Sequence, residues 1–429
     1  MIDKLRVLEC FAGVGSQSMA LRNIGVNYEV VGIMEIDKHA LVGYSAIHKD
    51  LIDNIPAVSD DYMYNYLRKK EVGTNFSTGK NELPKKGEKL RQIYLADMKT
   101  NNLGDISLVN VNDIPDHDFM TYSFPCKNIS NEGKQDGFEE GSGTQSSLVW
   151  ECKKIIESKK PKFLMMENVK NIVSKVHKSY FDSWCNWLTS MGYKNYWKIY
   201  NGNDFGVAQS RERVIMISIK EEICNRINFT EPNSNGKKQK LIDIVDYSTL
   251  EDYLIDINSL EGFVEIIDNN LLNGIRNKII DEGILFTNKE SKEIIERRNK
   301  YLPLYSDLNN SSLIVREATK IGYKVAEVGD SINLSQKNSK TRRGRVGKEE
   351  AKTLTTACEQ AIVLDGYKIK KLSPLEAWRL QGFSDGDYYK AEKAGIPKIN
   401  LYERAGRGIV VPMLEEIFKC LFKEYIVKN

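Results

Sequence analysis

The segment Leu5-Arg-Val-Leu-Glu-Cys-Phe-Ala-Gly-Val-Gly-Ser-Gln-Ser-Met-Ala-Leu-Arg22 decides the fold class of this chain. Its first part predicts a short buried strand, and Ala12–Arg22 predicts a glycine-rich turn that opens a helix. A second strand is expected over Tyr28–Glu35. Strand, glycine turn, helix, strand and acid is the order of a nucleotide-binding βαβ unit, because glycine lets the backbone approach a ligand and the acid can hold ribose hydroxyls. Ser18 stands where a third glycine would be expected, so a glycine turn without a ligand is the alternative.

Composition sets the broad class of the protein. The chain has 429 residues, enough for a sizeable core and, by length, for two domains. No apolar run reaches membrane-spanning length and the N-terminus lacks a signal-peptide core, which predicts a cytoplasmic protein that does not meet a membrane. Seven scattered cysteines without a CxxC pair, and only four histidines, argue against a disulfide framework and a zinc site. A net charge of +3 is too small to indicate nucleic acid by itself.

A second informative stretch is Thr121-Tyr-Ser-Phe-Pro-Cys-Lys-Asn-Ile-Ser130. The apolar run before it predicts a strand, and Pro125 favours a geometry that presents Cys126 rigidly at the strand end. A thiol there can be a nucleophile, a metal ligand or a packing residue, and packing is the commonest of the three. The glycine-rich run 131–144 that follows is either an active-site lid or an exposed connector.

Two carboxylates are expected at the edge of the same sheet. An apolar strand over Pro161–Val169 reaches Glu167, and a carboxylate there is costly to bury without a purpose, because desolvation disfavours its charged form. Asp105 is expected at another strand end. A carboxylate in that place can accept from an adenine amine, although by default it only caps a turn.

Two arginines, Arg211 and Arg213, lie between strands expected at Lys194–Tyr200 and Val214–Ile219. Our interpretation of this extended segment sends their side chains to opposite faces. Arginines in such a place are usually a solvated surface pair, and that is the alternative to a role in a site.

Composition also suggests domain boundaries. We expect a first domain over 1–220 with a surface insertion at about 49–103, a second domain over 221–345, and a return to the first over 346–429. Lys337–Lys348 carries six basic residues in twelve and is the best candidate for phosphate contact, with a solvated basic loop as the alternative. A later helix is expected over Leu372–Phe383, capped by Ser373.

Taken in order, these blocks resemble the DNA (cytosine-5)-methyltransferases of bacterial restriction–modification systems and phages. The resemblance covers residues 5–220 and 340–429. It implies an α/β fold in which a Rossmann-like S-adenosylmethionine-dependent methyltransferase domain carries a smaller variable target-recognition domain. The blocks are Phe11-Ala-Gly-Val-Gly15, Glu35-Ile-Asp37, Gly104-Asp-Ile106, Phe124-Pro-Cys126, Glu167-Asn-Val169, Gln209-x-Arg-x-Arg213, Thr353-Leu-Thr355, Arg379-Leu-Gln-Gly-Phe383 and Gly406-x-Gly-Ile-Val410.

The resemblance implies methyl transfer from S-adenosylmethionine to C5 of a cytosine flipped out of a specific duplex DNA sequence, with S-adenosylhomocysteine as product and no metal. It assigns Cys126 as the nucleophile that adds to C6 and Glu167 as the acid at N3. Arg211 would hold O2 of the base, and Arg213 would support the Cys126 loop.

The resemblance also implies a set of cofactor contacts. Phe11 would cover the adenine face, Glu35 would take the ribose hydroxyls, and Asp105 would take the adenine amine. The turn on the methionine side and the rest of the pocket would consist of Gly13, Val14, Gly15, Ile36, Ile106, Pro125, Leu148 and Val410.

Double-stranded DNA is the implied partner, contacted by Lys127, Ser130, Arg342, Arg343 and Arg345. A cognate restriction endonuclease acting on the same site is a further possible partner, and a monomer is expected. The alternatives are a transfer-RNA cytosine-5 methyltransferase, a catalytically inactive DNA-binding homologue, and a nicotinamide dehydrogenase, which would explain only the βαβ start.

Three positions depart from the usual family pattern. Lys127 replaces a glutamine beside the expected nucleophile, and Arg407 stands in a turn that is usually Gly-Asn-Ser or Gly-Asn-Ala. Gln145-Ser-Ser147 stands where Arg-Ser-Gly is common. We expect Lys127 to face the DNA, where it could contact a phosphate or an unpaired base.

Overall fold

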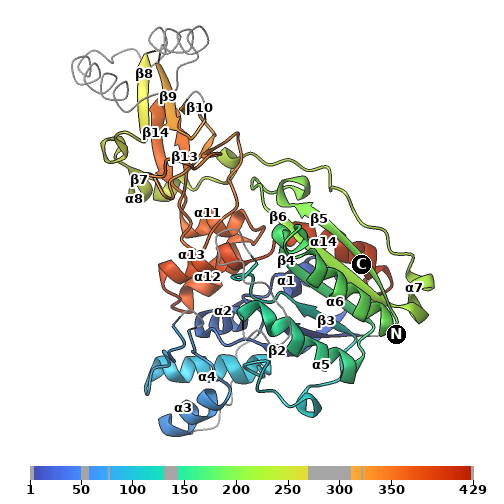
Figure 1. The fold of residues 1–429 in the computed structure, drawn as a ribbon. Coiled ribbons are helices and arrows are strands. Elements are labelled where there is room, and N and C mark those ends of the chain that lie inside the picture. The colour runs from blue at the N-terminus through green and yellow to red at the C-terminus, as the bar shows by residue number, and fades with distance from the viewer. Residues whose placement is uncertain are drawn as a thin grey trace.

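The computed structural model describes residues 4–49, 58–75, 78–129, 144–268, 311–319 and 322–426. A larger part, in the lower half of Figure 1, is built on a six-stranded sheet. A smaller part above it carries a five-stranded and a three-stranded sheet. Across these described ranges, no helix has the length and apolar character needed to cross a membrane.

The six-stranded sheet has a parallel core and an antiparallel edge, with strand order β2-β1-β3-β4-β6-β5. Its direction of growth reverses at β1, which pairs with β2 on one side and β3 on the other, and ligands bind at such a switch point, beyond the carboxyl ends of the strands. The predicted α/β class is therefore confirmed. The strands are β1 (Leu5–Cys10), β2 (Tyr28–Met34), β3 (Phe119–Tyr122), β4 (Phe163–Val169), β5 (Tyr193–Asn201) and β6 (Glu212–Lys220).

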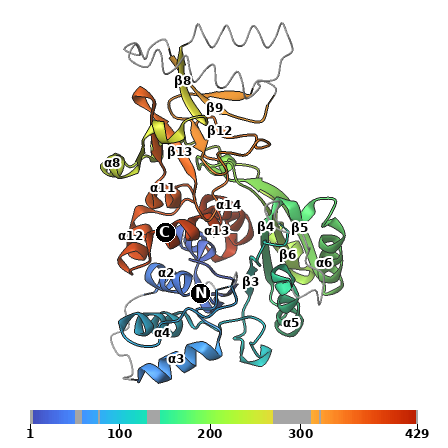
Figure 2. The same ribbon diagram turned by 60° about the vertical axis from the view of Figure 1, so that its left-hand side comes forward.

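Helices cover both faces of this sheet, because the apolar side chains of its strands alternate between two clusters. Val7 belongs to one cluster and Leu8 to the other. The cluster of Leu8 includes side chains of α5 (Val149–Lys159) and α6 (Lys178–Ser190), and that of Val7 includes α1, α2 and α14. Figure 2 shows the two layers on either side of the strands. The helices named on the side of Val7 are α1 (Ser16–Asn23), α2 (Lys38–His48) and α14 (Val411–Leu421).

Two α-helices lie in the described residues of the segment where a surface insertion is predicted at about 49–103. They are α3 (Asp60–Lys69) and α4 (Glu88–Thr100), close to the ranges that the sequence suggests. The two helices pack on each other, and α4 also packs on α2. Residues 50–57 and 76–77 of this segment lie outside the described residues.

The smaller part continues past the boundary expected at residue 345. Its five-stranded sheet has the order β12-β11-β13-β14-β7, and β12 to β14 all lie beyond that residue. The chain then returns to the larger part through α11 (Pro374–Arg379), α12 (Asp385–Lys393) and α13 (Lys398–Arg407). The remaining elements are α7 (Glu221–Ile227), β7 (Leu254–Ile255), α8 (Leu250–Tyr253), β8 (Val264–Asp268), β9 (Ser311–Arg316), β10 (Tyr323–Ala326), β11 (Ser331–Asn333), β12 (Val346–Gly347), β13 (Gln360–Leu364) and β14 (Lys368–Lys371).

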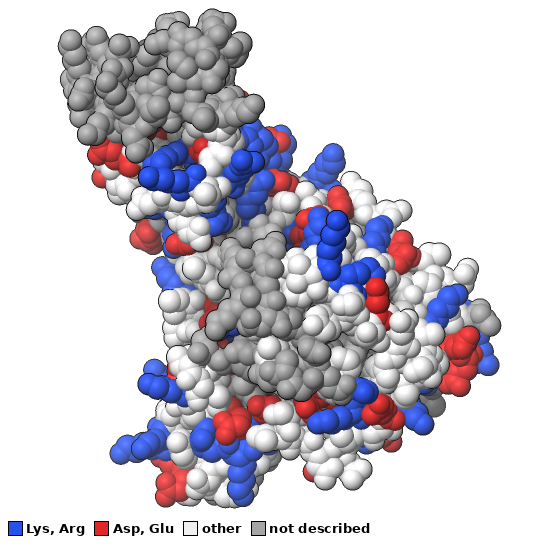
Figure 3. Space-filling model, in the orientation of Figure 1, with Lys and Arg blue, Asp and Glu red and all other residues white. Residues whose placement is uncertain are grey.

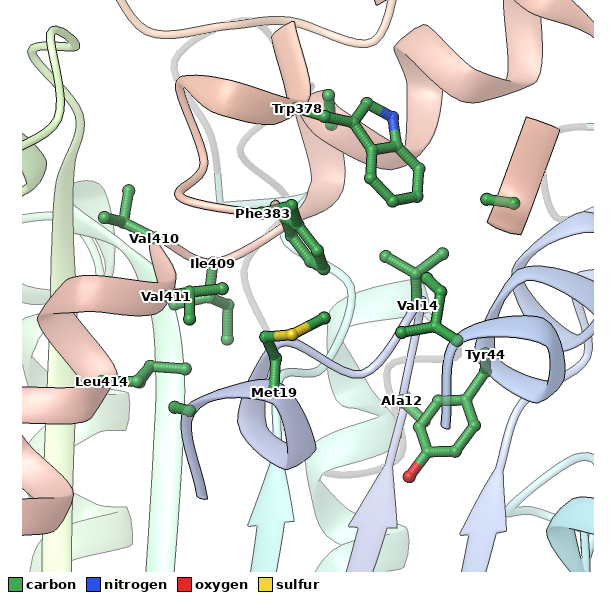
Figure 4. Close-up of a cluster of buried hydrophobic side chains, with 14 of the residues drawn as sticks. Ala12, Val14, Met19, Tyr44, Trp378, Phe383, Ile409, Val410, Val411 and Leu414 are labelled. Carbon is green, nitrogen blue, oxygen red and sulfur yellow. The ribbon is translucent and has the colours of Figure 1, made fainter. Parts of the chain in front are cut away.

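The two ends of the described chain pack together beneath the switch point. Val26 and Ile426 form an isolated antiparallel bridge, and the backbone N–H of Asn27 donates to the carbonyl of Tyr425 at 2.9 Å. Figure 4 shows apolar side chains of the first turn and α1 meeting those of residues 378–414. The C-terminal segment therefore supports the glycine turn from behind.

Candidate active site

A cleft of about 1630 Å³ opens at the carboxyl ends of β1 to β4. The first glycine turn, the loop after β2, the Cys126 loop and the end of β4 line it on the side of the larger part. Asn333, Arg342 and Gly344 line it from the smaller part. The fold thus brings the predicted cofactor turn, the predicted nucleophile and part of the basic loop to one cleft.

The first turn has the backbone geometry that its glycines suggest. Gly13 and Gly15 have φ of 58° and 80°, in the left-handed region, where glycine avoids a steric cost. Phe11, Gly13 and Val14 line the cleft. Gly15 is not among the residues that line it: it faces α2, and an added Cβ would lie 2.5 Å from Nε2 of His48. Close helix packing, rather than ligand contact, requires glycine there.

Glu35 is held at the edge of the cleft by backbone groups. Its Oε2 accepts from the N–H of Gly13 at 2.9 Å, and its Oε1 accepts from the N–H of Asp37 at 2.8 Å. The amide of Asn102 binds both backbone polar groups of Glu35 at 3.0 Å. Burial, together with the charge of Asp37, raises the pKa of the Glu35 carboxyl. Asn102 is a positioning residue that the sequence analysis did not identify.

A charged cluster lies beside Glu35. Asp37 caps α2 through the N–H groups of His39 and Ala40, and its Oδ2 lies 2.9 Å from Nη2 of the buried Arg404. Burial by itself would raise the pKa of Asp37, but Arg404, the Ala40 N–H and Arg407 lower it to about 2. Arg407, at 3.7 Å from Asp37, therefore joins this cluster. The sequence of α13 does not by itself predict that this helix lies beside the end of β2.

The Cys126 loop is fixed by contacts from two other segments and by one hydrogen bond within the loop. Asn168 donates to the carbonyl of Phe124 at 3.2 Å, and Ser146 donates to that of Pro125 at 2.7 Å. The N–H of Ile129 donates to the carbonyl of Cys126 at 2.9 Å. Cys126 is consequently held half-buried at the cleft surface, as its position after a strand and a proline predicts.

Glu167 and Arg213 form an ion pair in the cleft, with 3.1 Å between Oε1 and Nε. Both side chains are almost buried, at 11% and 12% exposure. Burial raises the pKa of Glu167, against the lowering effect of Arg213 and Arg211. Burial also raises the pKa of the Cys126 thiol, with Arg213 and Arg211 lowering it and the charge of Glu167 raising it further. The ionisation of the Cys126 thiol therefore depends on the charges of Glu167 and of the two arginines.

Arg211 has a different environment. It is buried, and its terminal nitrogens donate to the backbone carbonyls of Leu354 at 3.0 Å, Gly406 at 2.8 Å and Gly408 at 2.9 Å. The expectation that Arg211 and Arg213 point to opposite faces is wrong, because residues two apart on an extended segment share a face and both act on Glu167. Arg211 ties the C-terminal segment to β6.

Of six other residues predicted to contact the cofactor, five line the cleft and one does not. Ile36, Asp105, Ile106, Pro125 and Leu148 line the cleft, and Asp105 also binds Ser107 N–H at 2.8 Å, so it caps its turn as well. Val410 does not line the cleft: it is buried against Gly202, and Figure 4 places it on the side away from Ala12. Its neighbour Ile409 takes the lining position. The motif located this turn between α13 and α14, but the side chain that lines the cleft is that of the residue before Val410.

The predicted DNA contacts also divide. Lys127 is exposed and lines the cleft, and Arg342 lines it from the smaller part. Ser130 and 131–143 of the glycine-rich run lie outside the described residues. Arg343 is exposed, but its Nε donates to the carbonyl of Ala318 at 2.8 Å. Figure 3 shows Lys and Arg side chains on the smaller part, next to Asp and Glu, and others spread over the larger part.

Arg345 needs a correction. Its side chain is buried, at 1% exposure, and its guanidinium donates to the carbonyls of Ser335 and Gln336 at 3.0 and 2.8 Å. A side chain enclosed in this way does not reach DNA directly. A run of basic residues predicts a charged loop but does not distinguish an arginine that builds the loop from those that the loop presents.

Comparison with known proteins agrees with the geometry. Residues 78–423 match the family described as C-5 cytosine-specific DNA methylase. The chain is 35% identical to the type II methyltransferase M2.ScrFI of Lactococcus lactis subsp. cremoris, over 98% of this chain and 99% of that protein. It is 27% identical to the orphan methyltransferase M.SPBetaI of Bacillus phage SPbeta, over 100% of both.

Among solved structures, the fold is similar to that of the S. pombe Dnmt2 methyltransferase. The TM-score is 0.52 at 13% identity, and the match covers 98% of this chain and 99% of that one. At this identity the likeness concerns the fold alone.

Proposed function

The chain belongs to the C-5 cytosine-specific DNA methylase family, and from this premise we propose that it transfers the methyl group of S-adenosylmethionine to a flipped-out cytosine through a covalent bond to Cys126. Methylation of cytosine in DNA is the activity of the family. The observation that carries the finer proposal is the meeting of Cys126 with the Glu167–Arg213 ion pair in one cleft, next to the first glycine turn.

The cofactor part of the proposal rests on the chemistry of the donor groups. The carboxylate of Glu35 can accept from a ribose diol, and the positive φ of Gly13 leaves room for a close backbone approach. Phe11, Ile36 and Ile106 offer apolar surface for an adenine ring. The residues therefore fit S-adenosylmethionine, which supplies an electrophilic methyl group when bound.

The chemistry of the base explains why a thiol and an acid are needed together. C5 of cytosine is a weak nucleophile, and a bond from Sγ of Cys126 to C6 makes it electron-rich. Glu167 donates a proton or hydrogen bond at N3, where negative charge would otherwise collect. After methylation, a base removes the C5 proton, the electron pair reforms the C5–C6 double bond, and the thiolate leaves. Because the reacting carbons lie inside a duplex, the base must first be flipped out.

The contacts of Arg211 and Arg213 favour exchanging the roles that the family resemblance assigns to them. Arg213 is paired with Glu167 and lies at the cleft surface, so its guanidinium can also reach O2 of a base bound at that carboxyl. The terminal nitrogens of Arg211 are occupied by three backbone carbonyls. We therefore assign the base contact to Arg213 and the support of the surrounding segments to Arg211.

Methyl transfer from tritium-labelled S-adenosylmethionine tests the proposed function. We expect label to enter duplex DNA at cytosine C5 and not to enter transfer RNA supplied in parallel. Label in transfer RNA alone would contradict a DNA substrate, and label in neither would contradict the activity. Bisulfite sequencing of DNA from cells that express the protein identifies the methylated sequence. A cognate endonuclease remains part of the proposal, motivated by a relative named as a type II methyltransferase. A monomeric state also remains part of the proposal.

Replacing Lys127 with glutamine should change DNA affinity and preserve the chemistry. Lys127 is exposed in the cleft beside Cys126, and an ammonium there attracts a phosphate or an unpaired base. We expect the Kd for duplex DNA to rise and its salt dependence to weaken, with kcat within a few-fold of wild type. The exposed Lys154, paired with Glu151 on α5, is the control position. A fall in kcat at unchanged Kd would contradict a DNA contact.

A further inference from the structure

The loop between β11 and β12 carries most of the basic run singled out in the sequence. Residues 336–338 and 340–341 are exposed, and the loop includes Lys337 and Lys340. Gly344, at φ of 67°, lets the chain turn back into β12. Asn333, Arg342 and Gly344 line the cleft, so the loop faces the same space as the Cys126 loop.

Arg345 holds this loop together from within. Its guanidinium spans the loop and donates to the successive carbonyls of Ser335 and Gln336. It also stacks over the ring of Phe263 at 4.7 Å. Glu317 accepts from the backbone N–H groups of Arg345 and Val346 at 2.7 and 3.2 Å, which fixes the end of the loop where it enters β12. The two ends of the loop are thereby tied to each other and to the sheet.

The adjacent Arg342 and Arg343 differ in whether their guanidinium groups already have hydrogen-bond partners. Arg343 uses its Nε on the carbonyl of Ala318. The backbone carbonyl of Arg342 accepts from the N–H of Ala318 at 2.9 Å, so its main chain is fixed too. Within the described part of the chain, however, the guanidinium of Arg342 makes no hydrogen bond or ion pair, although it is half-buried in the cleft wall.

We propose that Arg342 is a specificity-determining residue that binds the O6 and N7 edge of a guanine in the recognition site, and that Arg345 positions it. The proposal rests on the proposed function and adds to it the base that one side chain reads. Arginine presents a planar fork that matches the two acceptors of guanine in the major groove. Such a pair needs a fixed main chain, which the Arg345 contacts supply. A phosphate contact would not need it, and the exposed Lys337 and Lys340 are better placed for that role.

The experiment compares Arg342→Gln with the matched neighbour Arg343→Gln. Duplexes carry the methylated site of the wild-type enzyme with each base pair replaced in turn, and both methylation and binding are measured for every duplex. We expect Arg342→Gln to lose discrimination at one guanine position by about 5- to 150-fold, the range of a bidentate pair, while the other positions keep their profile. Arg343→Gln should leave the profile unchanged.

Two further variants test the positioning role. Arg345→Lys keeps the charge but cannot bridge two carbonyls, and Arg345→Met keeps much of the side-chain length without any donor. Both should lose discrimination at the same guanine position as Arg342→Gln, with KM for DNA rising more than kcat falls. Thermal unfolding and S-adenosylmethionine binding, compared with wild type, show whether the larger part is intact. A lowered Tm with an unchanged sequence profile would reduce Arg345 to a structural residue and overturn its part of the proposal.

The outcomes separate this inference from the proposed function. If Arg342→Gln weakened methylation of every duplex equally, and the salt dependence of binding fell, Arg342 would be a phosphate contact and the inference would be wrong. An unchanged profile would overturn it as well. A wild-type chain that methylated no DNA would contradict the proposed function. In that case a duplex selected from a random pool by binding to the wild-type chain would replace the methylated site, and the binding profiles of its base-pair variants would still test guanine reading.

Discussion

Replacing Cys126 with serine is expected to abolish methyl transfer, with a loss of turnover on the order of 10³-fold or more, the scale seen when a covalent nucleophile is removed. A hydroxyl is far less acidic than a thiol, so it offers almost no anion to attack C6. Burial already raises the pKa of the Cys126 thiol, so a still weaker acid in the same place would stay protonated. The measurement is tritiated-methyl transfer to duplex DNA under single-turnover conditions.

The covalent bond itself can be observed with a modified substrate. A duplex with 5-fluorocytosine at the target position cannot lose a proton from C5, so the methylated adduct should accumulate as a complex that survives denaturant. We expect this complex with wild type and not with Cys126→Ser. The half-buried Cys420 on α14 is the control, and Cys420→Ser should behave as wild type. Turnover retained in Cys126→Ser would contradict the covalent mechanism.

Glu167→Gln should lower kcat by about 10²- to 10⁴-fold, the contribution of a positioned general acid, with a smaller effect on DNA binding. The amide keeps the shape of the side chain and can donate a hydrogen bond, but it cannot deliver a proton to N3. It also removes the charge that pairs with Arg213 at 3.1 Å. Steady-state and single-turnover kinetics on the same duplex give kcat and the chemical step.

The pH dependence follows from the direction of the shifts. Burial raises the pKa of Glu167, so its protonated form persists to higher pH than in an ordinary glutamate and is lost as pH rises through the raised value. The Cys126 thiolate appears only as pH rises through its own raised pKa. The rate should therefore rise with thiolate and fall with loss of the acid, giving a bell-shaped profile whose values belong to the coupled pair.

Glu167→Gln should alter that profile in a specific way. The decrease in rate at high pH that is due to ionisation of Glu167 should disappear. The pKa of Cys126 should also drop, because the charge of Glu167 raises it in wild type. Alkylation of Cys126 with iodoacetamide as a function of pH measures this shift. The control is Glu212→Gln, which changes an exposed carboxylate paired with Lys170 one residue from Arg213. An unchanged Cys126 titration in Glu167→Gln would contradict the electrostatic coupling.

Local pattern was enough to predict the main elements and two of the cleft groups. The strand, glycine turn and helix at residues 5–22 follow from apolar periodicity and from glycine's access to positive φ. The Ser373 cap was readable in the same way, and it is present, with Glu376 completing the capping box. Cys126 and Glu167 were each expected at a strand end, and parallel strands bring such ends to one edge of the sheet. Hydrophobic periodicity and turn preferences depend on residues that are close in the chain, so they can be recognised from a single sequence.

Contacts between distant segments decided the rest. Arg211 and Arg213 look equivalent in the sequence, but one meets three carbonyls from residues 354–408 and the other meets Glu167. Arg342 and Arg345 lie in one basic run, yet only Arg342 is left facing the cleft, because Arg345 is used to close the loop. The amino-acid sequence determined the sheet, its glycine turn and the residues at its edge. Only the tertiary structure decided which charged side chains stabilise the fold and which remain accessible to a ligand. The reason is that a buried charge must be paired or hydrogen-bonded, and its partners come from segments that are distant in the sequence.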